Sequence, residues 1–507
     1  MRNLTARSSL LSTRGYFRTF CTESNDSSYI RCAVVGSGPA GFYTAKYLLD
    51  KNKAIHVDIL ESLPTPYGLV RQGVAPDHQE VKSVMATFME VAENSRFRYF
   101  GNVQVGSENA ESQKSVSVSE LKKAYDVVVL AYGASSDRNL GISGEDLSGA
   151  MSARSFVNWY NGHPNYKNIG ESFDLSKIKR VVVIGQGNVA IDCARILMKS
   201  ADDLGSTDIA SHALSALKNS AVEEVVIIGR RGHVQASFTI KEMRELTKLT
   251  GVSVSVLHSE LSSSLTEASK SELSANRPKH RIVELINKIA DDTTTAEFNG
   301  MKGKKISFRF LLSPVEILSK SGDASAVGSI VLNKNKLVEE AGRQVAISTD
   351  EKETIACDLI LKSVGYKSQI MFGVPFDPKK NVVPNLQGRV LDDSVVDEAA
   401  GNKFVEGLYV TGWLKRGPSG IIGTNITDAK ETVECILSDI AQRDTKYDKI
   451  DPIQVIPALT NDDVITWEDY MRIQVEEETR GRGSSPQKPR EKICDLNELI
   501  SIAKNRK

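Results

Sequence analysis

The sequence predicts an α/β protein with two Rossmann-like units, because one pattern of strand, glycine-rich turn and helix occurs twice. The pattern begins at residue 31 and again at residue 180, and a further strand follows each copy, as in a Rossmann unit. Apolar strands at 125–131 and 358–364 lie on either side of the second copy. We interpret them as crossovers, so the second unit is predicted to be inserted into a discontinuous first domain.

In the first unit, the strand at 31–35 leads into Gly36-Ser-Gly38-Pro-Ala-Gly41, and helical spacing continues to residue 50. The first glycine allows a tight turn, the second lets the backbone approach a pyrophosphate, and the third lets the helix pack on the strand. The next strand, 56–60, ends at Glu61, 20 residues after Gly41. A carboxylate at this position can accept hydrogen bonds from an adenosine ribose, so the unit is predicted to bind a dinucleotide.

The second unit differs in the charge at its far end. Its turn is Gly185-Gln-Gly187-Asn-Val-Ala190, and its second strand, 225–228, ends in Gly229-Arg230-Arg231. A 2′-phosphate on the adenosine repels a carboxylate and pairs well with guanidinium groups. The arginines therefore favour NADP over NAD, with a solvated arginine pair at a strand end as the alternative. Opposite charges imply two cofactors, FAD in the first unit and NADPH in the second.

A third glycine-rich segment follows the strand at 407–411. Gly412-Trp413 comes first, then Gly417-Pro-Ser-Gly420-Ile-Ile-Gly423, and then a helix with apolar residues at helical spacing. Such a helix start is predicted to meet a flavin ring; a structural turn around a core tryptophan is the alternative. Elsewhere, residues 66–78 are predicted to be an irregular loop, 202–222 an inserted loop with a helix extension, 319–354 an exposed hairpin region, and 481–492 irregular.

Composition is that of an ordinary globular protein. The 507 residues are 40% hydrophobic and 25% charged, which excludes a disordered chain. Lys plus Arg and Asp plus Glu are both 64, a balance that argues against a general nucleic-acid coat. No apolar run approaches the length of a membrane span, which leaves a peripheral membrane contact open.

The N-terminus has a composition of its own. Residues 1–22 contain Arg2, Arg7, Arg14 and Arg18 among hydroxyl and apolar residues, with no acid before Glu23. This composition is typical of a mitochondrial presequence, so residues 1–28 are predicted to be cleaved and the protein to lie on the matrix side of the mitochondrion. A disordered basic arm is the alternative.

The cysteines are scattered along the chain. No two of them have the CxxC or CxxxxC spacing of a redox dithiol, or the clustering of a metal or iron–sulfur site. We expect inert thiols in a reducing compartment and no metal. The six are Cys21, Cys32, Cys193, Cys357, Cys435 and Cys494.

Five stretches, in order, resemble the adrenodoxin reductases, a family of mitochondrial-type ferredoxin–NADP reductases. The resemblance implies hydride transfer from NADPH to FAD, then single electrons to an adrenodoxin-like [2Fe–2S] ferredoxin. It also implies a glutathione-reductase-like arrangement without the redox disulfide, with an FAD domain at 30–133 plus 366–507 and an NADP domain at 134–365. The stretches are VVGSGPAGFYTA, PYGLVRQGVAPDH, VIGQGNVAIDCARIL, GRRGHVQASFTIKEMRE and TGWLKRGPSGIIGTN.

The resemblance extends to individual positions. His78 and Asp192 match a His and an Asp near the flavin for which proton handling has been suggested; a buried His–Asp hydrogen bond is the alternative. Together with the motif glycines, the implied FAD contacts are Gly36, Gly38, Ala40, Gly41, Glu61, Leu69, Val105, Trp413, Gly420, Ile421 and Ile422. The implied NADP contacts are Gln186, Gly187, Asn188, Val189, Arg230, Arg231, Glu242 and Gly420.

An acidic ferredoxin would need concentrated positive charge for docking. Without the first 22 residues the chain has 60 basic and 64 acidic residues, a net charge near −4. The densest basic run is Arg277-Pro-Lys279-His-Arg281, and Arg244 lies in the preceding helical segment. We predict docking there, on the NADP domain; solvated charges at a helix start are the alternative.

Two other functions stay open. One is an electron-input subunit like the small subunit of glutamate synthase, although such proteins usually carry a cysteine-rich segment that this chain lacks. The other is a nucleotide-binding redox sensor with little turnover. NADPH-dependent ferricyanide reduction would separate an enzyme from a sensor.

Overall fold

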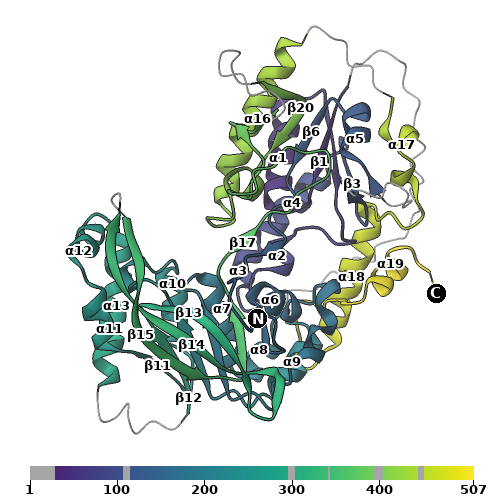
Figure 1. Cartoon of the computed structure of the whole chain (residues 1–507). Coiled ribbons are helices and arrows are strands. Elements are labelled where there is room, and N and C mark those ends of the chain that lie inside the picture. Colours follow the sequence, from purple (N-terminus) through teal and green to yellow (C-terminus); the bar gives the residue numbers. More distant parts are fainter. Residues whose placement is uncertain are drawn as a thin grey trace, which may run out of the picture.

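The computed structural model describes residues 29–106, 115–294, 303–340, 343–392, 403–443 and 450–506. Its strands form a seven-stranded sheet in the upper half of Figure 1 and a six-stranded sheet at the lower left. The first sheet takes strands from both ends of the chain, whereas strands between residues 150 and 362 form the second. The predicted insertion of one α/β unit into a discontinuous other is therefore confirmed.

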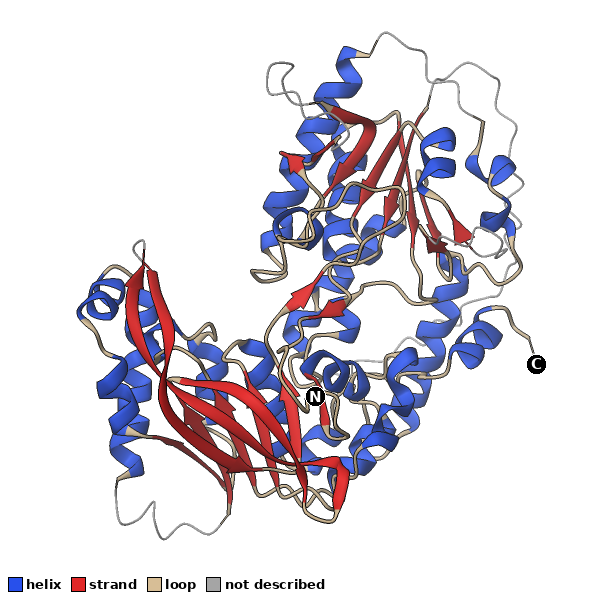
Figure 2. Cartoon of the chain, viewed as in Figure 1, coloured by secondary structure: helices blue, strands red, loops and turns tan. Residues whose placement is uncertain are grey.

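The first sheet has the order β18-β19-β20-β6-β1-β2-β3. Its centre is parallel, because β1 pairs with β2 and β6 in parallel and β20 pairs with β6 in the same way. Helices cover both faces (Figure 2), and alternate residues of β1 enter different cores. The strands are β1 (Ile30–Val35), β2 (Ile55–Leu60), β3 (Phe97–Phe100), β6 (Val127–Leu130), β18 (Asn385–Leu386), β19 (Arg389–Leu391) and β20 (Phe404–Val410).

On one face, Cys32 and Val34 pack with α1 (Pro39–Lys51), α4 (Val84–Ala92), α16 (Thr424–Gln442) and α18 (Trp467–Gly483). On the other face, Ala33 and Val35 pack with α5 (Val118–Ala124). Burial on both faces is why residues 32–35 of β1 form a continuous apolar run.

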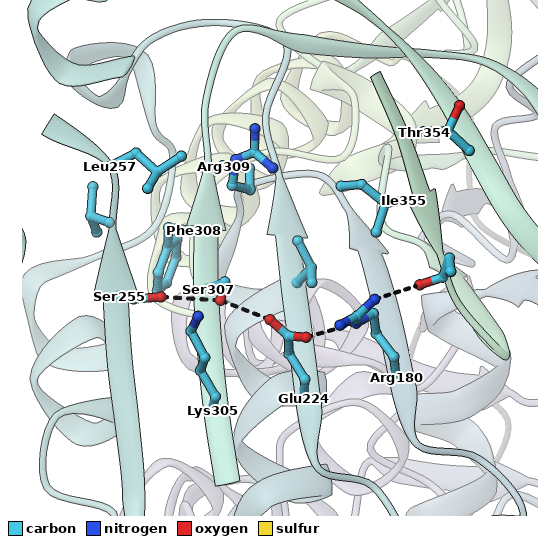
Figure 3. A pocket seen from close by; sticks show the side chains of 13 residues that line it. Arg180, Glu224, Ser255, Leu257, Lys305, Ser307, Phe308, Arg309, Thr354 and Ile355 are labelled. Carbon is cyan, nitrogen blue, oxygen red and sulfur yellow. Dashed lines mark hydrogen bonds and ion pairs between the residues drawn. The ribbon is translucent and has the colours of Figure 1, made fainter. Parts of the chain in front are cut away.

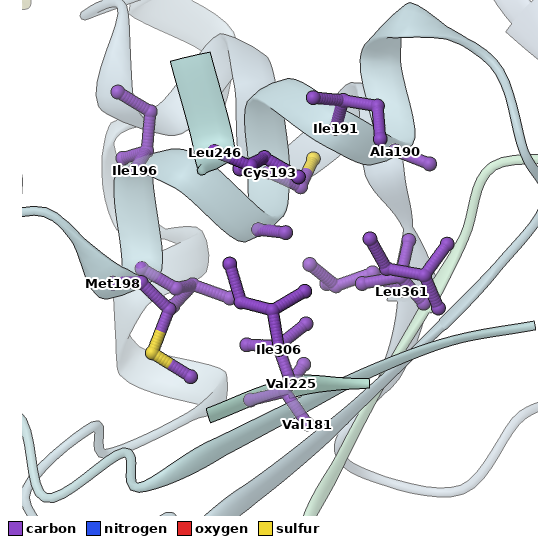
Figure 4. Close-up of a cluster of buried hydrophobic side chains, with 14 of the residues drawn as sticks. Val181, Ala190, Ile191, Cys193, Ile196, Met198, Val225, Leu246, Ile306 and Leu361 are labelled. Atoms are coloured by element: carbon purple, nitrogen blue, oxygen red, sulfur yellow. The ribbon is translucent and has the colours of Figure 1, made fainter. Parts of the chain in front are cut away.

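The second sheet is parallel throughout, in the order β11-β12-β10-β9-β16-β8. One face packs on α7 (Asn188–Met198), where Val181 and Val225 meet Ile191 and Cys193 (Figure 4). The strands are β8 (Ala150–Ser152), β9 (Arg180–Ile184), β10 (Glu224–Ile228), β11 (Val252–Val256), β12 (Lys304–Arg309) and β16 (Leu359–Lys362).

The other face of this sheet is partly covered by three antiparallel strands, β13 (Leu312–Lys320), β14 (Asp323–Glu340) and β15 (Arg343–Ala356). Ile330 and Leu332 of β14 pack against Val182 and Val226. The expectation of an exposed hairpin at 319–354 is thus only partly right, because alternate residues of β14 are buried in a core.

The segment 202–222 is not the predicted inserted loop. It contains α8 (Ala201–Gly205) and α9 (Ser211–Lys218), whose Leu204, Leu214 and Leu217 join the core of the second sheet. The high content of Asp, Ser and Ala indicated a loop, but in the short helices Asp202, Asp203 and Ser215 are exposed while Ala213 is buried in the core.

The chain passes between the sheets twice. The two passes pair as short antiparallel strands, β7 (Ser136–Asp137) with β17 (Tyr366–Lys367). Arg154 of α6 (Ala153–Tyr160) pairs with Asp137 of β7 at 2.9 Å. The short helices α2 (Leu69–Gln72) and α3 (Gln79–Lys82) belong to the first half of the chain and are labelled in Figure 1. After α18, the segment that begins at Ser484 contacts the part of the molecule built around the six-stranded sheet. There the Lys488 ammonium donates to Ser211 Oγ of α9 at 3.2 Å.

The remaining strands and helices complete the two halves. They are β4 (Gln104–Val105), β5 (Ser115–Val116), α10 (Ile240–Leu246), α11 (His258–Ser264), α12 (Glu267–Ser274), α13 (Arg277–Thr293), α15 (Trp413–Arg416), α17 (Pro452–Val455) and α19 (Leu496–Ala503).

Among the described residues, none of the helices has the length and apolar character that a membrane crossing needs.

Candidate active site

The first glycine turn connects β1 to α1 and leaves an open backbone surface. Gly36 has a φ of +106°, and a Cβ there would lie 2.7 Å from the carbonyl oxygen of Ala131. A Cβ on Gly41 would meet the Gly36 oxygen at 2.0 Å, whereas one on Gly38 would meet no atom of the described residues within 4 Å. The helix start has no side-chain cap. The turn thus fits a pyrophosphate lying over Gly38.

Glu61, at the end of β2, lies against this turn. One carboxylate oxygen accepts from the Ser37 amide at 3.0 Å and from Ser37 Oγ at 2.6 Å. The other accepts from Ser62 Oγ and the Leu63 amide, both at 3.0 Å. The carboxylate is therefore held at the edge of the open turn, where a ribose of a bound dinucleotide would lie.

The predicted loop at 66–78 covers the same turn. The Tyr67 amide donates to the Ser37 carbonyl oxygen at 3.1 Å, and a Cβ on Gly68 would lie 3.1 Å from Gly38 Cα. Tyr67 is buried with a φ of +82°, a backbone strain that persists at sites where the surroundings require it. Leu69 follows as the first residue of α2. Val105 lies elsewhere, in the core on the α5 face of the sheet.

The third glycine-rich segment adjoins the first turn, because a Cβ on Gly412 would lie 2.5 Å from the Ala40 Cβ. Trp413 stacks on Tyr366, with ring centroids 5.5 Å apart. Ile421 is 65% exposed, a large apolar side chain that a planar ring could cover. The segment thus offers Trp413, Gly420, Ile421 and the partly buried Ile422 along one stretch of chain.

Arg416 organises this segment and was not found by sequence reasoning. Its guanidinium donates to the Ser419 carbonyl oxygen and to Thr424 Oγ1, the latter at 2.8 Å, and pairs with Asp428. Trp413 Nε1 donates to the same Ser419 oxygen at 3.1 Å. The only sequence signal was an arginine beside a glycine-rich turn, which does not identify its partners.

The second glycine turn repeats the geometry of the first. Gly185 has a φ of +125°, and a Cβ there would lie 2.1 Å from the Ser363 oxygen, whereas a Cβ on Gly187 would meet no atom within 4 Å. The flanking side chains hold the turn: Gln186 Nε2 donates to the Arg309 oxygen at 3.1 Å, and Asn188 Oδ1 accepts from the Thr239 amide at 2.9 Å. Val189 lies next in α7.

Arg230 and Arg231 follow β10 beside this turn. Arg230 is exposed and Arg231 half-buried, and within the described part of the chain neither guanidinium forms an ion pair with a carboxylate. Burial and the neighbouring charge of Arg230 lower the pKa of Arg231. Glu272 acts on Arg231 only at longer range. Two cations that form no close ion pair among the described residues, next to an open helix start, make a site suited to a phosphate.

A buried ionic cluster joins the two halves. Its centre is Arg195 of α7, whose guanidinium lies 2.9 Å from Asp77, 2.7 Å from Asp192 and 3.0 Å from Glu242. Burial raises the pKa of Asp192 and of Glu242. Glu242, implied as an NADP contact, thus has its carboxylate on Arg195.

His78 belongs to this cluster but pairs with a residue that sequence reasoning missed. Its Nε2 lies 2.7 Å from Glu245 Oε2 and 3.9 Å from Glu242 Oε2. His78 and Asp192 are therefore brought into one cluster, in which Arg195 contacts Asp192 and also lies 3.4 Å from Glu245. Because Arg195 is a fixed positive charge beside both glutamates, the cluster does not suit a metal ion.

The basic residues predicted to dock a partner lie at the start of α13 and on α10. Arg244, Arg277 and Arg281 are exposed, whereas Lys279 is half-buried and pairs with Glu272. Asn276 caps α13 by accepting from the Lys279 amide at 3.2 Å. Three of the four cations are thus free to meet a partner.

A groove of about 460 Å³ lies outside these sites (Figure 3). It lies on the second sheet, where Ser255, Ser307, Glu224 and Arg180 form a hydrogen-bonded row. Because these polar groups satisfy one another, the groove is explained as a partly uncovered sheet face.

Comparison with known proteins gives consistent results. The family model "Pyridine nucleotide-disulphide oxidoreductase" matches residues 30–271. The protein from Arabidopsis thaliana called "NADPH:adrenodoxin oxidoreductase, mitochondrial" is 43% identical over 95% of this chain and 97% of its own, and the human protein of that name is 39% identical over 97% and 95%. The structure of Mycobacterium tuberculosis FprA in complex with NADPH aligns with a TM-score of 0.82 at 39% identity, covering 94% of this chain and 99% of its own. This chain belongs to the NADPH:adrenodoxin oxidoreductase family.

Proposed function

We propose that this protein is an FAD-dependent oxidoreductase that takes a hydride from NADPH and delivers single electrons to a mitochondrial [2Fe–2S] ferredoxin. The observation that carries the proposal is a pair of open glycine turns with opposite charges, Glu61 beside the first and Arg230 with Arg231 beside the second. A carboxylate suits a ribose and guanidinium groups suit a 2′-phosphate. The names of the relatives support the same NADPH-dependent activity.

We assign residues 30–133 and 366–507 to the FAD domain and 134–365 to the NADP domain. The pairing of β7 with β17 supports boundaries near these crossovers. The predicted presequence, residues 1–28, lies outside the described residues; the word "mitochondrial" in the names of relatives supports a mitochondrial location.

When bound, FAD supplies a hydride acceptor that can release its electrons one at a time. The chain would bind its pyrophosphate over Gly38, orient its ribose through Glu61, and cover its ring with Trp413 and Ile421. The second turn and the two arginines would hold NADPH. Apolar cover over the reacting rings would exclude water, which hydride transfer requires.

His78 and Asp192 are proposed to handle a proton at the junction. His78 can exchange a proton with Glu245, its neighbour at 2.7 Å. The buried Asp192 carboxyl, whose pKa is raised by burial, would act on the same cluster through Arg195. The role predicts that replacing His78 or Glu245 changes the pH profile of turnover, because a proton shared between these two side chains would then have no acceptor.

The decisive experiment mixes the FAD-loaded protein with NADPH without oxygen. We expect bleaching of the flavin absorbance, followed by reduction of two [2Fe–2S] ferredoxins per NADPH. Bleaching without ferredoxin reduction would favour the electron-input alternative, and neither signal would favour the sensor. NADH that bleaches the flavin as fast as NADPH would contradict the proposal.

Docking is proposed at Arg244, Arg277, Lys279 and Arg281, because an acidic ferredoxin needs concentrated positive charge. Replacing both Arg277 and Arg281 with Glu should slow ferredoxin association by about tenfold at low salt and remove most of its salt dependence. Ferricyanide reduction, which needs no docking, should stay near the parent rate. A matched control reverses Lys122 and Lys123 on α5, and a double variant indistinguishable from this control would contradict the docking site.

A further inference from the structure

The loop that carries Arg230 and Arg231 is held by hydrogen bonds to three successive carbonyl oxygens. Gly229 O accepts from the Leu312 amide at 3.0 Å and Arg231 O from the Leu311 amide at 3.2 Å. Between them, Arg230 O accepts from the side-chain amide of Asn335 at 2.8 Å. All three donors lie at or beyond the end of β12, about 80 to 105 residues later in the chain.

Asn335 is the one side chain among these donors, and its own environment fixes its orientation. It lies in β14 with 7% of its surface exposed. Its Nδ2 also donates to Ser313 Oγ of β13 at 2.8 Å, and its Oδ1 accepts from Ser348 Oγ of β15 at 3.3 Å. Its backbone amide donates to Leu311 O at 2.7 Å. All three strands therefore determine which way the amide points.

Such anchoring matters because the arginines repel each other. They are adjacent in sequence and, within the described residues, have no carboxylate in ion-pair contact. Without a phosphate between them, like charges favour conformations in which they move apart. The hydrogen bond from Asn335 to the Arg230 carbonyl oxygen limits that movement of the backbone. Binding a phosphate then costs less conformational entropy, because the loop is already ordered.

We propose that Asn335 is a positioning residue for cofactor selectivity, which holds the Arg230 backbone so that both guanidinium groups face one 2′-phosphate. The proposal rests on the proposed NADPH site. It gives the antiparallel strands β13–β15 a role in specificity, since they supply the side chain and the two hydroxyls that orient it.

The test uses a ligand that needs no electron transfer. 2′,5′-ADP carries the 2′-phosphate, and 5′-AMP lacks it; both are titrated calorimetrically into the FAD-loaded protein. Asn335→Ala should weaken 2′,5′-ADP binding by about fivefold to tenfold, the effect of one lost hydrogen bond, and 5′-AMP by less than about twofold. In turnover, the KM for NADPH should rise with kcat unchanged.

Asn333→Ala is the matched control, because Asn333 lies two residues earlier on β14 and its Oδ1 accepts no hydrogen bond from any residue that the structure describes. It should leave both affinities unchanged. If Asn335→Ala does not fold, Ser348→Ala removes only the orienting hydroxyl and should weaken 2′,5′-ADP by about twofold to threefold.

Two results would overturn this inference and leave the proposed NADPH site intact. The first is an Asn335→Ala protein, or the Ser348→Ala protein where that one is used, that binds 2′,5′-ADP as tightly as the parent. The second is equal weakening of 2′,5′-ADP and 5′-AMP binding, which would show a merely structural effect. A double Arg230/Arg231 variant that still binds 2′,5′-ADP like the parent would overturn the proposed NADPH site as well.

Discussion

At the first glycine turn the charged end of the unit is held by its own neighbours, whereas at the second it is held by a distant segment. Glu61 accepts four hydrogen bonds, all from Ser37, Ser62 and Leu63. The loop of Arg230 and Arg231 is anchored by Leu311, Leu312 and Asn335, and among the described residues its guanidinium groups form no ion pair with a carboxylate. The carboxylate of the first site is therefore held by residues of its own β–α–β unit and the two that follow it, whereas the arginine loop depends on residues at and within β13–β15.

The arginine pair offers the strongest way to break the comparison. Replacing both Arg230 and Arg231 with Gln should cost roughly 3–6 kcal/mol of NADPH binding, since each charged hydrogen bond to phosphate contributes about 1.5–3 kcal/mol. The KM for NADPH should rise by at least a hundredfold, and NADH should be used almost as before. Steady-state kinetics with both nucleotides check this. An unchanged NADPH/NADH preference would show that the charge signature does not select the cofactor.

The second unit should also be the more acid-sensitive of the two. His233 follows the arginine loop, is 2% exposed, and has a pKa lowered by burial from 6.5 to about 4. Because the unfolded state binds the proton more readily, stability is full above pH 6.5 and is lost as the pH falls towards 4.

The loss should reach about 3 kcal/mol. We expect the free energy of unfolding in urea to fall less between pH 7 and pH 4.5 in His233→Asn than in the parent. A parallel fall in both proteins would mean that His233 is not the group responsible.

Glu61→Gln tests the first glycine turn, where we expect FAD to bind. The amide nitrogen cannot accept the hydrogen bonds that the carboxylate oxygen accepts, so about 1–3 kcal/mol of FAD affinity should be lost. Extensive dialysis followed by flavin quantification measures this. Glu434→Gln, on an exposed ion pair with Lys51, is the control. Full flavin occupancy in Glu61→Gln would contradict the ribose role.

Local features of the fold were predictable from the sequence. The strand predicted at 31–35 is β1, the strand at 180–184 is β9, and both glycine turns leave the middle glycine open. These features depend on apolar runs and on glycine backbone geometry, which short segments determine by themselves.

Contacts between distant segments were not predictable. Nothing in the pattern around Asn335 connects it to Arg230, and the partner of His78 is Glu245 from α10. The Arg195 cluster likewise brings together three separate segments, the loop at 66–78, α7 and α10. Polar residues carry little periodic signal, so their partners are set by the packing of whole elements.

The most direct test measures both ligands on both variants under one set of conditions. FAD binding to the apoprotein and 2′,5′-ADP binding to the FAD-loaded protein are titrated for the parent, for Glu61→Gln and for the double Arg230/Arg231 variant. If the two units hold different nucleotides, Glu61→Gln should lose affinity for FAD and keep 2′,5′-ADP, and the arginine variant should show the reverse. Loss of both ligands in either folded variant, or of neither, would contradict the account.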